Sequence, residues 1–184
     1  MRNFALGMLF ALAVLLGGGY WVLKRGYVNL SADQKPGAME DHFAMTAVDA
    51  SLERRVIQRA NPVAATDDNL VAGARLYLDH CAGCHGVPLN PDSSFARSFY
   101  PPVPEFFSDP PDMSENQNFY IIQHGVRWTG MPAWNGTLTE PQIWQIVTFL
   151  SHIQKLPPAV QSVFGPETPT PPAMPMTMPM PMPH

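Results

Sequence analysis

Five consecutive residues, Cys81-Ala82-Gly83-Cys84-His85, constrain the fold of this 184-residue chain more than any other feature. The spacing C-x-x-C-H is the pattern through which a haem of the c type is attached to a protein. Two thiols three positions apart can each form a thioether bond to one porphyrin, and the histidine that follows then lies beneath the ring as an iron ligand. The chain has only these two cysteines, so none is left for a structural disulfide or a four-cysteine zinc site.

A dithiol redox pair is the alternative interpretation of the same cysteines. That interpretation requires a neighbouring pattern of strand, helix and strand, as in thioredoxin-like folds. No such pattern is visible in the sequence around the motif. The motif therefore favours haem attachment over dithiol chemistry.

Shifts in composition divide the chain into four segments. Residues 1–25 are mostly apolar, residues 26–65 form a spacer, and residues 66–157 have the mixed composition of a globular domain. Residues 158–184 are dominated by proline and methionine. The length is sufficient for one small domain with appended segments.

The first segment is predicted to be a membrane anchor. Phe4 to Leu23 contains twenty residues without a charge, and at ~1.5 Å per residue a helix of that length spans the ~30 Å hydrocarbon layer. It closes with Tyr20-Trp21 and Lys24-Arg25, which is typical of an interfacial aromatic belt with basic anchors. A cleaved secretory signal is the alternative, and the three glycines at 17–19 keep it open because they weaken a helix.

Helices are the only regular elements that the rest of the sequence predicts. One helix in the spacer begins at Glu40-Asp41, ends near three arginines, and has an apolar stripe that we expect to pack on the domain or the membrane. In the domain, Thr66 and Thr139 are predicted helix caps, and a short helix is expected from Ser114 to Gln123. No strand-like alternation appears, so the predicted fold is all-α. We also expect Gly73 of the first domain helix to pack against Trp144 of the last.

The domain resembles the class I cytochromes c, and in particular the membrane-anchored bacterial members that hold one haem. The resemblance covers 68–156 and is carried by the helix ending in C-A-G-C-H-G, by Gly130-Met131-Pro132-Ala133-Trp134, and by the closing helix. It implies the small all-α fold of that family around one covalent haem c. It also implies a location on the outer face of the bacterial inner membrane, because proteins with this motif are matured outside the cytoplasm.

The resemblance implies a ligand set as well. Cys81 and Cys84 take the two thioethers, His85 is the proximal iron ligand, and Met131 is the distal one. The chain has eleven methionines and six histidines, of which Met113 and His124 are the main rivals of Met131. Neither has the glycine-methionine-proline setting of Met131. Arg97, Arg127 and Trp128 are candidate donors to the haem carboxylates.

Ligation from both sides predicts an electron-transfer protein and no enzyme. An iron held by histidine and methionine keeps no open position for a substrate, and the thioether favours ferrous iron. The expected partners are a redox protein donor and acceptor, within or outside a membrane complex. A haem sensor or a peroxidase-like enzyme with a displaceable sixth ligand is the alternative function. Nucleic acid is disfavoured, since nine acidic and four basic residues give 66–156 a net charge of minus five.

The last segment is predicted to form no core. Residues 158–184 are nearly uncharged and end in alternating methionine and proline, a composition that favours an extended, disordered tail. Thioether and imidazole groups ligate Cu(I), so copper binding is one hypothesis for this tail. Methionines two residues apart do not share a face of a polyproline helix, which argues against several sulfurs gathering around one ion. A passive or partner-docking tail is the alternative.

Overall fold

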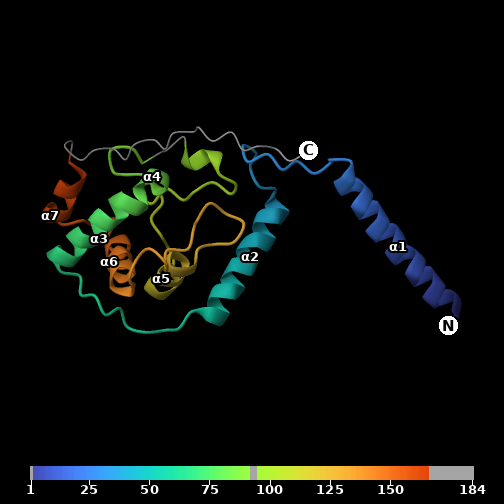
Figure 1. Cartoon of the computed structure of the whole chain (residues 1–184), viewed down its shortest axis with the longest axis horizontal. Helices are drawn as coiled ribbons and strands as arrows, with labels where there is room; N and C mark the ends of the chain where they lie inside the picture. Colours follow the sequence, from blue (N-terminus) through green and yellow to red (C-terminus); the bar gives the residue numbers. More distant parts are fainter. Residues whose placement is uncertain (1, 92–94, 166–184) are drawn as a thin grey trace. The chain divides into compact units, whose positions relative to one another are not determined.

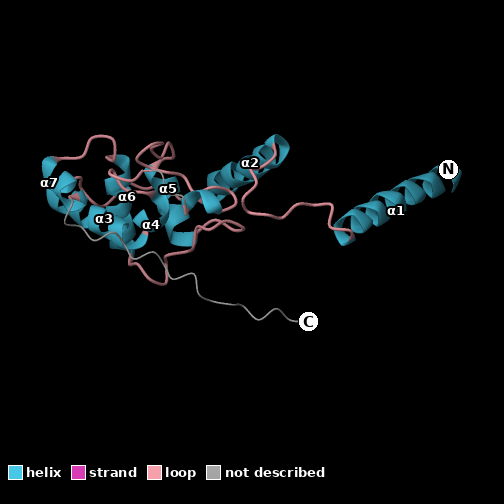
Figure 2. Cartoon of the chain, turned by 90° about the horizontal axis from the view of Figure 1, so that it is seen from above, coloured by secondary structure: helices cyan, strands magenta, loops and turns pink. Residues whose placement is uncertain are grey.

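A computed structural model describes residues 2–91 and 95–165 of the chain. The chain divides into two compact units, Met1–Ala32 and the part that begins at Asp33. Helices are the only regular elements in the described ranges (Figures 1 and 2), where a single isolated bridge joins Val87 and Asn90. The all-α prediction is therefore confirmed for these residues. The short helices are α4 (Ala82–His85), η1 (Ala96–Ser98), α7 (Pro158–Gln161) and η2 (Ser162–Phe164).

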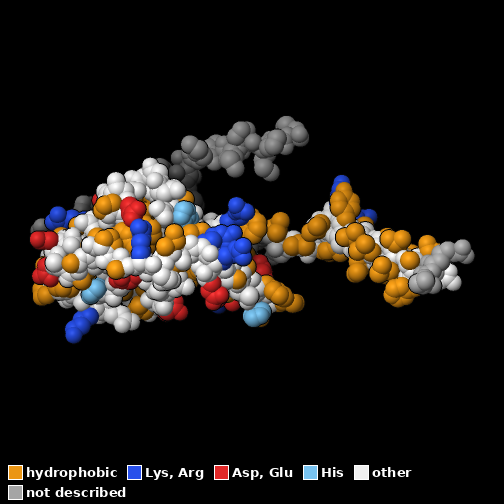
Figure 3. Space-filling model, turned by 90° about the horizontal axis from the view of Figure 1, so that it is seen from below, with side chains coloured by type: hydrophobic (Ala, Val, Ile, Leu, Met, Phe, Trp, Pro, Cys, Tyr) orange, Lys and Arg blue, Asp and Glu red, His pale blue; other side chains and the backbone are white. Residues whose placement is uncertain are grey.

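Helix α1 (Arg2–Lys24) lies in the first unit and is continuous through the three glycines at 17–19. Its hydrophobic side chains cover much of its surface in the space-filling view (Figure 3). A mean hydropathy of 2.0 and a length of 22 residues over Asn3–Lys24 suffice to cross a membrane, although a secretory signal has the same properties. At its end the guanidinium of Arg25 lies 5.4 Å from the centre of the Trp21 ring. The basic and aromatic residues at this end of the helix are therefore in contact with one another.

Helix α2 (Ala38–Arg55) is the predicted helix of the spacer. Its first turn holds Glu40 and Asp41 and its last turn Arg54 and Arg55, an order that suits the helix dipole. Only the second half of its apolar stripe is covered: Leu52 is buried, whereas Phe43 is 65% exposed. Glu40 also accepts a hydrogen bond from Tyr100, which raises the pKa of that phenol.

Three helices build the core of the second unit: α3 (Asp67–His80), α5 (Glu115–His124) and α6 (Glu140–Ser151). Each begins at a side chain that caps its free N–H groups, as the sequence predicts for Thr66 and Thr139. The Thr66 hydroxyl accepts from the Asn69 amide, while Ser114 and Thr139 form capping boxes with glutamines three residues later. Local polar contacts therefore determine where these helices start.

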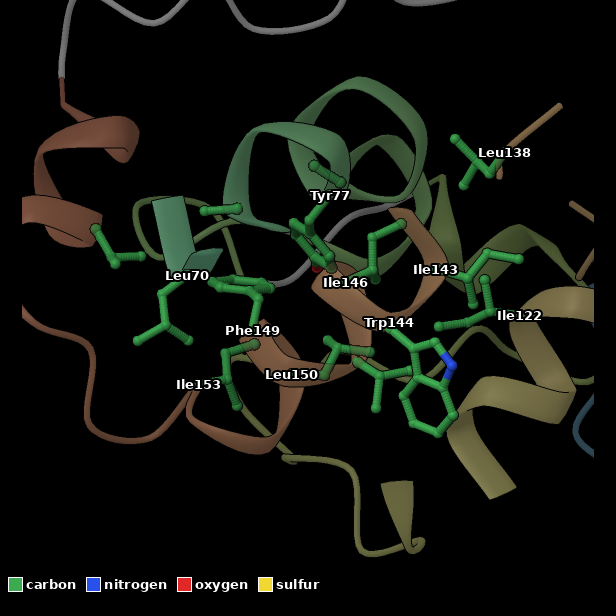
Figure 4. Close-up of a cluster of buried hydrophobic side chains, with 14 of the residues drawn as sticks. Leu70, Tyr77, Ile122, Leu138, Ile143, Trp144, Ile146, Phe149, Leu150 and Ile153 are labelled. Atoms are coloured by element: carbon green, nitrogen blue, oxygen red, sulfur yellow. The ribbon is translucent and has the colours of Figure 1, made fainter. Parts of the chain in front are cut away.

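The core lies where α6 packs between α3 and α5 (Figure 4). Trp144 is completely buried and stacks on Phe119 of α5, with ring centres 4.3 Å apart. The other large, fully buried side chains of hydrophobic residues are Tyr77, Phe149, Ile143, Ile146, Val147 and Val160. Burial of a side chain of this size stabilises the fold by about 1.5–3 kcal/mol, so this cluster supplies most of the attraction between the three helices.

The closest approach of α3 to α6 occurs at Gly73. A Cβ atom at this position would lie 2.1 Å from the Gln145 carbonyl oxygen and 2.9 Å from Phe149 Cβ. The predicted contact with Trp144 needs correction, because these nearest atoms belong to the next residue and the next turn of α6. Trp144 turns instead toward α5. The need for a glycine was predicted, but its partner was not.

Residues between α2 and α3, predicted as part of a spacer, pack on the core helices. The Arg59 guanidinium lies 4.8 Å from the centre of the Phe119 ring and 5.1 Å from that of Trp144, and it forms an ion pair of 2.7 Å with Glu140. The Asn61 amide donates to the Thr148 hydroxyl at 3.0 Å. The end of the spacer is therefore attached to the domain.

Residues 158–164 differ from the prediction of a disordered tail beginning at 158. They form α7 and η2, and Val160 and Phe164 are buried in the core. The Phe164 ring lies 5.6 Å from that of Phe107 and 5.9 Å from that of Phe149. These apolar side chains extend the globular part of the chain. The methionine-rich part of the tail and its copper hypothesis lie outside the described residues.

The substitution Gly73→Ala tests the close crossing of α3 and α6. The added methyl group overlaps the backbone of α6, so we expect the free energy of unfolding to fall by about 2 kcal/mol, as for other overpacked cores. Urea unfolding of the full chain in mild detergent, followed by circular dichroism, measures this change. Gly136→Ala is the control, because its Cβ would meet no atom within 4 Å. Equal losses in the two variants would contradict the crossing.

Candidate functional site

The C-x-x-C-H motif forms a single turn at the end of α3. Cys81 ends α3 and begins α4, and its carbonyl oxygen accepts from the amides of Cys84 and His85 at 3.0 and 2.9 Å. Gly86 follows with a φ of +81°, where a Cβ would lie 2.6 Å from the Pro91 carbonyl oxygen. A helix end and an obligatory glycine therefore hold the motif in this turn.

Tyr77 attaches the motif to the core. Its side chain is fully buried, and its hydroxyl donates to the Gly86 carbonyl oxygen at 2.8 Å. Its ring lies 5.2 Å from that of Phe149 and 5.9 Å from that of Phe107. Burial raises the pKa of Tyr77, with smaller contributions from the nearby cysteines, so the phenol remains a hydrogen-bond donor.

The two thiols are unpaired in the structure. Burial, and to a lesser extent Cys84, raises the pKa of Cys81 to about 12. Burial raises the pKa of Cys84 as well. Dithiol oxidoreductases work with a thiolate, whose pKa their surroundings lower. These raised pKa values therefore argue against the dithiol interpretation of the motif.

The His85 ring has a defined orientation. Its Nδ1 atom lies 2.8 Å from the Pro104 carbonyl oxygen, which can only accept, so Nδ1 carries the proton and Nε2 keeps its lone pair. The ring also stacks on Phe106, with centres 4.2 Å apart and planes 5° from parallel. Burial lowers the pKa of His85 and thereby favours neutral imidazole, the form that ligates metals.

Met131 lies at the base of a tight turn that follows α5. The Val126 amide donates to the Met131 carbonyl oxygen at 3.1 Å, and the Met131 amide donates to the Thr129 hydroxyl at 3.1 Å. Gly125, with a φ of +67°, allows this backbone to approach, since a Cβ there would lie 2.7 Å from the Met131 carbonyl oxygen. The turn is therefore held against the end of α5.

The motif and the Met131 turn meet at the core. His80, which precedes Cys81, packs on Trp134, three residues after Met131, with ring centres 5.2 Å apart. Cys81, Met131, Phe106 and Trp134 are all partly buried against the same cluster of core side chains. The fold thus brings both ends of the predicted ligand set to one core.

The alternative iron ligands and the candidate donors to the haem carboxylates make other contacts than His85 and Met131. Arg97 forms an ion pair of 3.8 Å with Glu105, and Trp128 is 90% exposed. His124 is exposed and packs on Tyr120, with ring centres 4.5 Å apart. The Met113 carbonyl oxygen accepts from the Asn118 side chain at 3.0 Å. The contacts of Arg97, His124 and Met113 involve neither the motif nor the Met131 turn, whereas Trp128 is itself part of that turn.

Sequence reasoning missed Pro104 and Phe106, which orient His85. They lie about twenty residues beyond the motif, in a loop where proline signals only an extended chain. No local pattern marks a carbonyl oxygen as the partner of a distant histidine. Only the preceding run of prolines indicates that this loop has a defined path.

The residues present fit a c-type haem. Two adjacent thiols, one imidazole with Nε2 left for a metal, and one thioether make up the donor set of such a site. The hydrogen bond from Nδ1 to a backbone carbonyl is the support that metal-ligating histidines commonly have. Within 2–91 and 95–165, no three His, Cys, Asp or Glu side chains converge to hold a metal ion by themselves.

Comparison with known proteins agrees with this geometry. Residues 68–150 match the family model of cytochrome c oxidase, cbb3-type, subunit III. No curated protein matches the chain. The helices, the motif and this match define residues 68–150 as a c-type cytochrome domain. The domain is of class I, and cytochromes of this class transfer electrons by means of haem.

The substitution Tyr77→Phe tests the link between the motif and the core. It leaves the buried Gly86 carbonyl oxygen without its donor, so we expect the free energy of unfolding to fall by about 1–2 kcal/mol. Tyr120→Phe is the matched control, because Tyr120 is only partly buried and its ring contact with His124 survives. Urea unfolding of both variants measures the difference. No loss in Tyr77→Phe would rule out this attachment.

Proposed function

We propose that this protein is a membrane-tethered periplasmic cytochrome that transfers single electrons through one haem c with histidine and methionine ligands. It acts as a carrier or as the cytochrome subunit of a respiratory or dehydrogenase complex. The observation that carries the proposal is the orientation of His85, whose hydrogen bond to Pro104 leaves Nε2 for iron on the same turn as both thiols. The cytochrome domain at 68–150 supports it.

Each residue of the site has a separate task in this proposal. Cys81 and Cys84 would hold the porphyrin by thioether bonds, and His85 and Met131 would supply a nitrogen and a sulfur ligand to its iron. When bound, the haem supplies a one-electron couple between ferric and ferrous iron. Pro104 and Phe106 keep the His85 ring from rotating, and the hydrogen bonds around Thr129 keep Met131 in place.

Electron transfer follows from the two protein ligands. If His85 and Met131 occupy both axial positions, no position remains for oxygen, peroxide or a substrate. A thioether ligand raises the reduction potential because it favours the ferrous state. A sensor or a peroxidase-like enzyme would instead need a sixth ligand that leaves, whereas the turn of Met131 is fastened at both ends.

The proposed organisation follows the chain. Residues 1–25 anchor the protein, residues 26–65 join the anchor to the domain, and the haem domain begins at 66. We extend its end from 157 to 165, since Val160 and Phe164 belong to the core. Thioether attachment outside the cytoplasm places the domain in the periplasm. Its partners are then redox proteins or subunits of a membrane complex.

One haem per chain is the first expected result. We expect the pyridine haemochrome spectrum of the purified full chain to give one c-type haem per polypeptide, retained after extraction with acidified acetone. The double variant Cys81→Ala, Cys84→Ala should retain none, because both thioethers are lost. Haem that is extracted from the unaltered chain by acetone would refute covalent attachment.

The ligand Met131 has its own test. We expect Met131→Ala to abolish the sulfur-to-iron absorption band in the red, and to lower the midpoint potential by on the order of 0.1 V, within the ~0.8 V that axial ligands span. The reduced variant should also bind carbon monoxide, because it has an open position. Met113→Ala is the control methionine and should leave all three properties unchanged. Carbon monoxide binding by the unaltered reduced protein would favour the sensor or peroxidase alternative.

A further inference from the structure

Trp128 has a position that the packing of the domain does not explain. Its side chain is 90% exposed, and its φ of 63° makes it the one non-glycine residue with a positive φ among the described residues. This left-handed conformation is unfavourable for a bulky aromatic residue, and the Trp128 side chain is not buried in compensation. Residues held in strained conformations cluster at functional sites. The exposed ring therefore needs a reason outside the fold.

The turn that holds Trp128 is closed by several hydrogen bonds. Between Val126 and Met131, the Thr129 amide and hydroxyl both bond to the Val126 carbonyl oxygen, at 3.3 and 2.8 Å. The Met131 amide bonds in turn to the Thr129 hydroxyl. Trp128 thus lies at the tip of the turn whose base is the proposed iron ligand. A molecule that binds Trp128 comes close to the redox centre.

The surroundings of Trp128 are aromatic and cationic. The Arg127 guanidinium lies 5.9 Å from the centre of the Trp128 ring. Between Trp128 and Met131, Gly130 abuts the Phe99 ring, where a Cβ would lie 2.4 Å from a ring carbon. Phe99 in turn contacts the ring of Phe95, which is 40% exposed. An exposed cation beside apolar rings complements a surface that has an apolar centre and acidic groups around it.

We propose that Trp128 is the anchor by which this domain docks a redox protein whose contact surface has an apolar centre and an acidic rim. Arg127 pairs with that rim. The proposal rests on the electron-transfer function and specifies its partner. Tryptophan and arginine are the side chains that most often dominate the energetics of protein interfaces.

A protein partner fits this surface better than a lipid membrane. A bilayer with anionic headgroups faces the whole side of the domain, and the net charge of minus five between Thr66 and Leu156 is repelled by it. A protein can instead carry its acidic groups only near Arg127. At physiological ionic strength exposed charges act over ~8 Å, so such a local acidic patch is little affected by the acidic residues elsewhere on the domain. The single cation at Arg127 therefore suffices to orient a local contact.

Stopped-flow electron exchange tests the docking proposal. The probes are plastocyanin, an acidic blue-copper protein, and ferricyanide, a small reagent that needs no docking surface; the protein is the full chain in mild detergent. We expect Trp128→Gly to slow exchange with plastocyanin about tenfold, the effect of losing an interface anchor. The rate with ferricyanide should change less than twofold.

Two controls separate docking from folding. Glycine relieves the strain at a φ of 63°, so we expect the melting temperature of Trp128→Gly to equal or exceed that of the unaltered chain. Phe43→Ala removes another exposed aromatic side chain, on α2, and should leave both rates unchanged.

The substitution Arg127→Gln tests the pairing with the acidic rim. It should slow exchange with plastocyanin and weaken the dependence of that rate on salt.

Each other outcome has a distinct meaning. An unchanged plastocyanin rate in Trp128→Gly would overturn the docking proposal and leave the electron-transfer function standing. A loss seen only in vesicles of anionic lipid, and not in detergent, would show that Trp128 contacts the membrane and would also overturn it. If the unaltered chain exchanged no electron with ferricyanide, the electron-transfer function would fail, and the docking proposal with it.

Discussion

The crossing of α3 over α6 at Gly73 is the contact on which the rest of the structure depends. Because no side chain separates the two helices there, the backbone of α3 reaches the Gln145 carbonyl oxygen and the Phe149 side chain. This approach places Tyr77 in the core, one turn further along α3, and Tyr77 in turn holds the Gly86 carbonyl oxygen. The C-x-x-C-H motif lies between Tyr77 and Gly86, so this hydrogen bond attaches it to the core, although in the chain it only follows the end of α3.

The two halves of the proposed ligand set are held by different means. His85 is oriented by a backbone carbonyl and a stacked ring from the loop at 104–106, whereas Met131 is held by a hydrogen-bonded turn against the end of α5. The packing of His80 on Trp134 joins the two halves. The same turn that holds Met131 also exposes Trp128. Ligand placement and partner contact are thus combined in one short segment.

The globular part of the chain extends beyond the predicted haem domain, residues 66–157, at both ends. Arg59 covers the ring pair of Phe119 and Trp144 on one side, and Phe164 covers Phe107 and Phe149 on the other. A domain of about ninety residues has a modest core by itself. These two additions bury further aromatic surface, and the first attaches the spacer to the core helices.

The sequence alone determined the features that depend on near neighbours. Thr66, Ser114 and Thr139 cap their helices through contacts three residues away, and the motif of Cys81, Cys84 and His85 is a local pattern. Only the tertiary structure decided which surfaces meet: Gly73 with Phe149, His85 with Pro104, and Arg59 with Glu140. These partners are separated by about twenty to eighty residues, and no periodicity or cap records such a distance. For the same reason the sequence could not tell that Trp128 is exposed or that Phe164 is buried, since both depend on how the helices pack.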